Sequence, residues 1–257
     1  MNSPSLKDLL DVAVEAAYAG GRRTLDYFNT NVEVEIKADR TPVTRADRES
    51  EELIREHITR HFPSHEIVGE EGGTKKGDTG FRWIVDPIDG TKTFIHGVPF
   101  YGVLIGVEVA GLPSVGVIYM PALDEMICAA TGLGCLWNGR KASVSKTAKL
   151  SDAVLLTTNV SSCMARSNAY GKLAAATKFN RTWGDCYGYA LVATGRAEIM
   201  LDPAMNPWDC APMLPILREA GGHFSSWSGE ETIYGKDACA TNAALKSEVL
   251  EILAREK

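Results

Sequence analysis

The sequence predicts an α/β protein whose first half, up to about residue 150, is α+β and whose second half, residues 151–257, is α/β. Two observations predict this class. Runs rich in β-branched residues fill about residues 82–130, and strand and helix patterns alternate from Val154 onward. The chain has 257 residues, of which 45% are hydrophobic, so its apolar side chains suffice for a sizeable core.

The first half is expected to begin with two helices. Apolar side chains recur at helical spacing over residues 6–28, and a second stripe follows the capping-box pattern of Thr44 and Asp47 and ends before Pro63. Between these helices, residues 32–36 alternate with period two, which predicts a half-buried strand. A mostly antiparallel sheet is then expected from strands at residues 82–85, 101–110, 115–120 and 126–130.

The second half shows the alternation typical of α/β proteins. A glycine pair, Gly221-Gly222, is expected to cap the helix that it follows, and Asn242 is expected to cap a terminal helix ending near Lys257. The expected order is a strand from Val154, a helix at 167–177, a strand, a helix at 187–194, a strand at 197–201, a helix at 209–220 and a strand at 239–241.

The composition excludes several classes of function. Lys and Arg total 27 against 33 Asp and Glu, a formal net charge of −6, which is the wrong sign for a broad contact with a nucleic-acid backbone. The most apolar stretch, residues 98–123, contains Glu108 and Pro113, which are unfavourable in a membrane-spanning helix. Acidic and basic residues within the first 25 positions argue against a signal peptide. The six cysteines include no CxxC pair, so we expect reduced thiols in a cytoplasmic protein.

Residues 83–91 are the most informative segment. An apolar run ends in Asp86, Pro87 restricts the backbone, and Gly90 permits an unusual conformation after Asp89. Two carboxylates held in a rigid turn at a strand end suit Mg²⁺, which prefers oxygen ligands. The alternative is an ordinary surface turn, for which Asp-Pro and Asp-Gly are common signals.

Two further acidic sites favour the magnesium interpretation. Glu70-Glu71 follows an apolar pair, and Asp209 opens an expected helix. Each has a simpler explanation, since the glutamates suit a solvated loop and Asp209 suits the positive end of its helix dipole. No spacing rule proves that these residues converge on Asp86 and Asp89.

Three segments together resemble the magnesium-dependent phosphatases of the inositol monophosphatase family. They stand in the family's order and spacing, and the resemblance covers essentially the whole chain. The resemblance implies a layered αβαβα sandwich with the site between the two halves, and a homodimer. The segments are Gly69-Glu70-Glu71, Asp86-Pro87-Ile88-Asp89-Gly90-Thr91, and Trp208-Asp209 with Glu219-Ala220-Gly221-Gly222.

The resemblance also implies roles for individual residues. Glu70, Asp86 and the carbonyl of Ile88 would hold one Mg²⁺, and Asp86, Asp89 and Asp209 a second, while Glu70 would also touch a weaker third ion. Metals in such pairs stabilise the attacking and leaving oxygens of a phosphoryl transfer. Glu70, Thr91 and Asp47 are the implied catalytic residues, with Thr91 and Asp47 orienting the attacking water. Asp47 also fits a simpler role at its helix start, and the two roles are compatible.

The second half is expected to select the alcohol part of a small phosphate monoester. Residues 181–188 and 201–209 resemble the histidinol-phosphatase branch of the family more closely than the inositol branch. This favours L-histidinol phosphate, whose ammonium and imidazole groups could pair with Asp185 and Asp202. The implied substrate-binding residues are Gly90, Thr91, Arg181, Gly184, Asp185, Cys186, Asp202 and Asp209.

Alternatives stay open at this stage. An Arg181–Asp185 salt bridge could merely shape its loop, and Trp183 could simply belong to the core. An inositol-1-monophosphatase or a broad-specificity sugar or polyol phosphatase is the first alternative function, and a catalytically silent binding protein is the second. Lys37 is interpreted as a solvated surface charge, and His57 and His61 as surface histidines, not as a zinc site.

Overall fold

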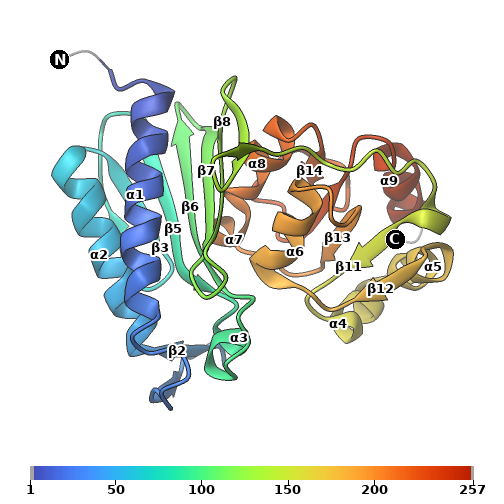
Figure 1. The fold of residues 1–257 in the computed structure, drawn as a ribbon, viewed down its shortest axis with the longest axis horizontal. Helices are drawn as coiled ribbons and strands as arrows, with labels where there is room; N and C mark the ends of the chain where they lie inside the picture. Colours follow the sequence, from blue (N-terminus) through green and yellow to red (C-terminus); the bar gives the residue numbers. More distant parts are fainter. Residues whose placement is uncertain (1–2, 256–257) are drawn as a thin grey trace.

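The computed structural model describes residues 3–255. Its elements form five layers, helix, sheet, helix, sheet and helix, which follow one another from left to right in Figure 1. This is the layered sandwich expected from the family resemblance. None of the helices in the described residues is both long enough and apolar enough to cross a membrane.

The larger sheet consists of strands that all precede residue 142. Only the β3–β5 pair is parallel among its described strand pairs, so the expectation of a mostly antiparallel sheet is confirmed. In spatial order the strands are β10 (Arg140–Lys141), β9 (Gly134–Trp137), β8 (Glu125–Ala130), β7 (Leu112–Met120), β6 (Gly102–Val109), β5 (Phe81–Asp89), β3 (Glu66–Gly69) and β4 (Gly73–Lys75).

Helices α1 (Leu6–Thr24) and α2 (Arg45–His61) cover one face of this sheet (Figure 1). Most residues of their apolar stripes are buried, as Leu9 and Ile54 illustrate, and they pack against sheet residues such as Trp83, whereas Leu53 is exposed. Both helices start with a capping box, in which Ser5 caps α1 and Thr44 caps α2. The first helix ends earlier than expected, at Thr24.

A separate hairpin precedes α2. Among the strands of residues 3–255, β1 (Val34–Ile36) pairs only with β2 (Pro42–Thr44), in an antiparallel register. All three residues of β1 are exposed, so the expectation of a half-buried strand is wrong. The alternation in the sequence is real, but β1 belongs to a separate two-stranded sheet and is exposed along its length.

The smaller sheet mixes parallel and antiparallel pairs. Strand β11 is parallel to both of its neighbours, whereas β15 is antiparallel to both of its own. In spatial order its strands are β12 (Phe179–Arg181), β11 (Val154–Leu156), β13 (Ile199–Asp202), β15 (Ala238–Thr241) and β14 (His223–Ser225).

Helices cover both faces of the smaller sheet (Figure 1). Tyr189 of the middle layer and Leu217 of the same layer share a core with Met200 of the smaller sheet and with residues of the larger sheet such as Leu104. Between the sheets lie α6 (Asp185–Ala193), α7 (Pro207–Cys210) and α8 (Met213–Glu219), and the outer layer holds α4 (Val160–Arg166), α5 (Ala169–Ala176) and α9 (Lys246–Arg255), with a 3₁₀ turn at Leu150–Asp152.

Two helices of the second half differ from the expectation. The helix expected at 209–220 is divided into α7 and α8, because Pro212 has no backbone N–H to continue the first helix. Its expected end is confirmed, since Gly221 has φ +81° and the Gly222 N–H donates to the Leu217 carbonyl at 2.8 Å. The terminal helix begins at Lys246, and its expected end near Lys257 lies outside the described residues.

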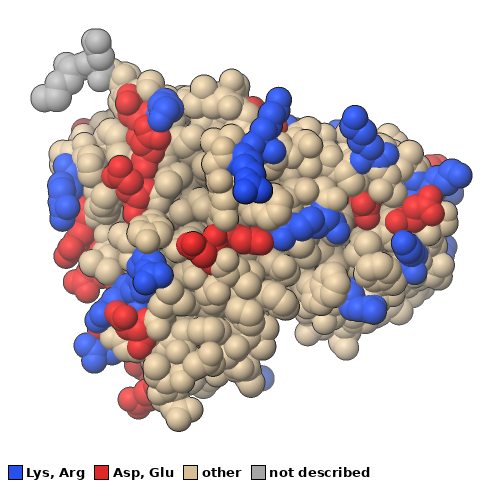
Figure 2. Space-filling view, viewed as in Figure 1, with Lys and Arg blue, Asp and Glu red and all other residues tan. Residues whose placement is uncertain are grey.

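Charges of both signs are interspersed on the face of the molecule that Figure 2 shows. No broad basic surface is visible on that face, which agrees with the formal net charge of −6.

Candidate active site

Strand β5 delivers the first two carboxylates. Its residues from Trp83 to Val85 are buried, and they anchor a strand end at which Asp86 is only 2% exposed. The pairing of β5 with β6 is irregular between Asp86 and Asp89, and the Ile88 N–H turns inward to donate to Asp86 Oδ1 at 3.0 Å. A surface turn would leave Asp86 in solvent, so that alternative is wrong.

The chain turns sharply after β5. Gly90 has φ +83°, a left-handed conformation that suits glycine, and it precedes the short helix α3 (Thr91–Ile95). This turn places Thr91 beside the carboxylates of the strand end. Thr91 Oγ1 lies 3.1 Å from the Ile88 carbonyl and 3.3 Å from Asp47 Oδ1.

The third carboxylate comes from α7, far along the sequence. The Asn206 N–H donates to Asp209 Oδ2 at 2.7 Å, so Asp209 does take part in a capping box. One oxygen atom each from Asp86, Asp89 and Asp209 nevertheless lie within 4.8 Å of one another. The simple explanation of Asp209 as a helix-start residue is therefore incomplete.

The pKa values of these three carboxyl groups are all raised by burial and by neighbouring negative charges. Burial, followed by the charge of Glu70, raises the pKa of Asp86 well above its usual value. Burial and the charge of Asp185 do the same to the pKa of Asp89, and burial raises the pKa of Asp209 to about 7. No ion pair in the described part of the chain balances this cluster. A hard cation with oxygen ligands would relieve the repulsion, so the residues present fit a bound metal ion.

Glu70 lies at the edge of the cluster and has a cation partner. The Glu70 N–H is held by the Val85 carbonyl at 3.1 Å, and Lys37 Nζ donates to Glu70 Oε1 at 2.7 Å and to Glu71 Oε1 at 2.8 Å. The interpretation of Lys37 as a solvated surface charge is wrong, because the β1–β2 hairpin folds it onto these two glutamates. The two glutamates are thus not a free solvated loop either.

Asp47 contacts a different residue with each of its two carboxylate oxygens. Its Oδ2 accepts hydrogen bonds from Thr44 N–H at 2.8 Å and Thr44 Oγ1 at 2.6 Å, which caps α2. Its Oδ1 faces Thr91 Oγ1 at 3.3 Å. Burial raises the pKa of Asp47 to about 6, which is close to the range where a carboxylate exchanges protons at neutral pH.

The cluster opens into a cavity of about 530 Å³ that extends over the first turn of α3 and the start of α6. Asp185 lies on its wall, where the Thr93 hydroxyl donates to Asp185 Oδ2 at 2.9 Å and Thr158 Oγ1 accepts the Asp185 N–H at 2.8 Å. Burial raises the pKa of Asp185. Residues that line this cavity and were expected at the site are Glu70, Asp86, Ile88, Asp89, Gly90, Thr91, Gly184, Asp185 and Asp209.

Asp202 lies in an adjoining cavity of about 170 Å³, which Asp89, Asp185 and Asp209 also line. It is 3% exposed and accepts hydrogen bonds from Thr158 N–H at 2.9 Å and from the Tyr189 hydroxyl at 3.0 Å. Burial raises the pKa of Asp202 to about 7.

Two other expected residues, Arg181 and Cys186, do not line these cavities. Arg181 Nη1 donates to the Asn180 carbonyl at 2.7 Å, and the Arg181 guanidinium covers the Phe179 ring. No Arg181–Asp185 salt bridge occurs in the described residues, and Trp183 is 40% exposed, so neither simpler explanation holds. Cys186 is buried, and its backbone N–H donates to Asp89 Oδ2.

The sequence analysis missed the residues that hold Asp185 and Asp202 in the walls of the two cavities, which together form an acidic wall. Thr93 and Thr158 hold Asp185, and Tyr189 holds Asp202. The position of Thr93, two residues after Thr91, was a weak signal. Thr158 and Tyr189 had none, because only the packing of β11 and α6 brings them to the site.

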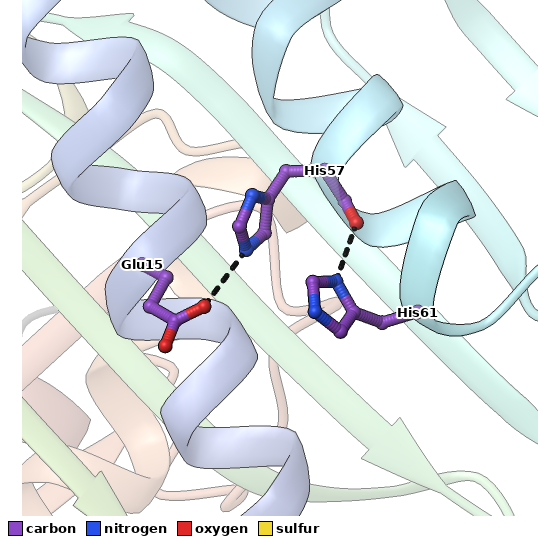
Figure 3. A group of neighbouring side chains, drawn as sticks. All are labelled: Glu15, His57 and His61. Atoms are coloured by element: carbon purple, nitrogen blue, oxygen red, sulfur yellow. Dashed lines mark hydrogen bonds and ion pairs between the residues drawn. The ribbon is translucent and has the colours of Figure 1, made fainter.

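A second group of metal-ligand side chains lies on the first two helices (Figure 3). His57 and His61 of α2 face Glu15 of α1, and His57 Nε2 lies 3.1 Å from Glu15 Oε2. The interpretation as independent surface histidines is therefore incomplete. The four-residue spacing was a sequence signal, but only the fold supplies Glu15.

The fold and the site define a phosphatase, an enzyme that hydrolyses phosphate monoesters. The chain belongs to the inositol monophosphatase family, because residues 5–257 match the sequence model of that family. The family is metal-dependent, and the carboxylate cluster can hold a metal ion.

Known proteins similar to this chain carry two kinds of name. A "Histidinol-phosphatase" of Chlorobaculum parvum is 43% identical over 92% of this chain and 93% of its own length, and one of Mycobacterium tuberculosis is 39% identical over 86% and 87%. "Inositol monophosphatase 3" of Solanum lycopersicum is 35% identical over 97% of both chains. Among solved structures, the extragenic suppressor protein suhB of Bartonella henselae has a TM-score of 0.89 and 30% identity over 95% of this chain and 98% of its own.

Proposed function

We propose that this phosphatase is Mg²⁺-dependent and hydrolyses L-histidinol phosphate to L-histidinol and phosphate, a step of histidine biosynthesis. The observation that carries the proposal is the acidic wall of the cavities. Asp185 and Asp202 lie next to the carboxylate cluster, and neither forms an ion pair with a basic side chain within residues 3–255. Similarity to the two histidinol-phosphatases supports the same substrate.

The proposed metal ligands follow from the chemistry of the donors. Glu70, Asp86 and the Ile88 carbonyl would hold one Mg²⁺, Asp86, Asp89 and Asp209 a second, and Glu70 would also contact a third. All are oxygen donors, and the last three are already close to one another. Bound Mg²⁺ supplies positive charge that stabilises the phosphoryl group and the leaving oxygen as the ester bond breaks.

The remaining chemistry belongs to the chain's own side chains. Thr91 Oγ1, in contact with Asp47 Oδ1, orients the attacking water, and Asp47 takes up its proton through the threonine hydroxyl. The pKa of Asp47, raised to about 6, suits a proton acceptor at neutral pH. The backbone N–H groups of Gly90 and Thr91 bind phosphate oxygens at the turn after β5.

The substrate's alcohol part then faces the second half of the chain. We propose that residues 1–150 supply most metal ligands and that residues 151–257 set specificity. A cationic ammonium or imidazolium beside Asp185 and Asp202 would stabilise their ionised forms, whereas a neutral polyol would leave both carboxylates without a counter-charge.

Inositol-1-monophosphatase or broad-specificity sugar phosphatase activity is the alternative, and the Solanum lycopersicum relative favours it. A catalytically silent binding protein is not favoured, because Glu70, Asp86, Asp89, Thr91 and Asp209 all line one cavity. The homodimer and the cytoplasmic location stay predictions; light scattering on the purified enzyme tests the first.

The experiment that tests the proposal is phosphate release with Mg²⁺, with EDTA as a control, from L-histidinol phosphate, inositol-1-phosphate and an aryl phosphate. We expect a preference for histidinol phosphate. Asp185→Asn should raise KM for histidinol phosphate about tenfold or more and change KM for the aryl phosphate less, because a contact to a charged group is lost.

Asp152→Asn is the matched control, because Asp152 is exposed in the 3₁₀ turn and does not line the cavities. A preference for inositol phosphate would keep the reaction and overturn the substrate. An equal rise in KM for histidinol phosphate and the aryl phosphate in Asp185→Asn would make Asp185 a structural residue. Activity that persists in EDTA would overturn the metal dependence.

A further inference from the structure

We propose that Glu15, His57 and His61 form a second metal site, for Zn²⁺ or a divalent ion of similar ligand preference, which joins helix α1 to helix α2. One ligand atom from each side chain lies within 4.8 Å of the other two. The site is separate from the carboxylate cluster, since His57 follows Asp47 by ten residues, about 15 Å along α2.

The two histidines are arranged as a helical ligand pair. They stand four residues apart on α2, so they share one face of the helix, and their ring centroids are 4.7 Å apart. Figure 3 shows both rings on the side of α2 that faces α1, with Glu15 reaching toward them.

Hydrogen bonds orient the rings for ligation. His61 Nδ1 lies 3.0 Å from the His57 carbonyl, so this nitrogen carries the proton and leaves the lone pair on Nε2. Metal-binding histidines typically donate their other ring nitrogen to a carbonyl or carboxylate in this way. His57 Nε2 lies 3.1 Å from Glu15 Oε2, where a bound ion would replace the shared proton.

The surroundings favour a cation that arrives from solvent. His57 and His61 belong to the last turns of α2, whose carbonyl ends carry partial negative charge. The Glu15 side chain is 61% exposed and that of His57 is 19% exposed, which gives an ion access and leaves room for water as a further ligand. The packed stripes beneath, including Ala13 and Ile58, hold the two helices in register before any ion binds.

The donor set selects the class of ion. Two imidazole nitrogens and one carboxylate oxygen suit Zn²⁺, whereas Mg²⁺ prefers oxygen ligands alone. The two sites should therefore discriminate between the two ions. An ion held jointly by Glu15, His57 and His61 would bind the folded protein more tightly than the unfolded chain, and so would raise the melting temperature.

The test is calorimetric titration of the Mg²⁺-saturated full-length protein with ZnCl₂ at neutral pH. We expect one Zn²⁺ per chain and a higher melting temperature with Zn²⁺ present. His61→Ala and Glu15→Gln should each weaken this binding at least tenfold and remove the shift in melting temperature between samples with and without Zn²⁺.

His96→Ala is the matched control. His96 is exposed, and its Nδ1 contacts the carbonyl four residues earlier, at 2.7 Å from Lys92 O, as His61 does with His57. This variant should bind Zn²⁺ like the wild type. The proposal is overturned if the wild type binds no Zn²⁺ with Mg²⁺ saturating, or if His61→Ala binds it with unchanged stoichiometry and affinity, which would place the ion at the carboxylate cluster.

Discussion

Thr91 Oγ1 lies 3.3 Å from Asp47 Oδ1, a contact between the first residue of α3 and the third residue of α2. The contact ties the turn after β5 to the helix layer that covers the larger sheet. Asp47 Oδ2 also accepts two hydrogen bonds from Thr44. These bonds fix the carboxylate, so that Asp47 Oδ1 has a fixed position relative to the Thr91 hydroxyl.

This contact predicts the behaviour of Thr91 variants. Thr91→Val should lower kcat by about 10²–10⁴ and leave KM nearly unchanged, because it removes the hydroxyl that orients water and keeps the side-chain shape. Thr91→Ser retains the hydroxyl and should stay within about tenfold of the wild type. Steady-state kinetics on both variants check this; equal kcat values for Val and wild type would contradict the assignment.

Removing one charge from the cluster should separate activity from stability. Asp86→Asn should abolish phosphate release and, in EDTA, raise the melting temperature, because a buried like charge is lost while the Ile88 N–H keeps an oxygen acceptor. Mg²⁺ should stabilise the wild type and not the variant. Calorimetry with and without Mg²⁺ checks this, with the exposed Asp78→Asn as control. A metal-free variant less stable than the wild type would argue against charge repulsion.

Lys37 should compete with magnesium for Glu70. Its ammonium already contacts Glu70 and Glu71, so Lys37→Met should lower the half-saturating Mg²⁺ concentration about threefold to tenfold, or ~0.6–1.4 kcal/mol. Lys75→Met is the control, because Lys75 donates to Thr59 Oγ1 and the Pro63 carbonyl instead. Activity measured against Mg²⁺ concentration checks this. A higher requirement in the variant would mean that Lys37 positions Glu70 for the metal.

Asp202 should make stability depend on pH. Its pKa is about 7 in the folded protein against 3.8 ordinarily, so between these pH values the folded chain keeps a proton that the unfolded chain has lost. The free energy of unfolding therefore falls as pH rises through this window, by up to ~4 kcal/mol from this residue.

Asp202→Asn should flatten that decline, since the amide cannot ionise. Urea unfolding of the metal-free protein at pH 5 and pH 8 gives the change in the free energy of unfolding between these pH values. This change should be smaller in Asp202→Asn than in the wild type, and Asp152→Asn is the control. An identical change with pH in the wild type and in Asp202→Asn would show that Asp202 is ionised over this whole pH range.

Close packing places α7 against the larger sheet. A Cβ at Gly106 would lie 2.4 Å from Ala211 Cβ, directly after the helix that carries Asp209. Gly106→Ala should therefore destabilise the protein by about 1–3 kcal/mol and raise the Mg²⁺ requirement. Gly171→Ala in α5 has only Met164 nearby, at 3.4 Å, and should be neutral or stabilising. Urea unfolding and a Mg²⁺ titration check both; a neutral Gly106→Ala would mean that α7 can move away freely.

Local patterns predicted much of the structure. The capping box at Thr44 and Asp47, the glycine cap after α8 and the strand that carries Asp86 depend on residues close in sequence, and all are present. The predictions that were wrong concern burial and partners. The alternation at β1 did not indicate that this strand is exposed. The sequence around Lys37 did not indicate that this residue contacts glutamates.

The sequence by itself determined the residue types of the site and their order along the chain, because turns, caps and apolar periodicity depend on neighbouring residues. Only the tertiary structure decided which of these residues meet. It brings Asp209 to Asp86, Glu15 to His57, and Asp202 to a cavity that Asp89 and Asp209 also line. These contacts join residues distant in sequence through the packing of whole layers, and packing of that kind depends on the shape and burial of every layer at once.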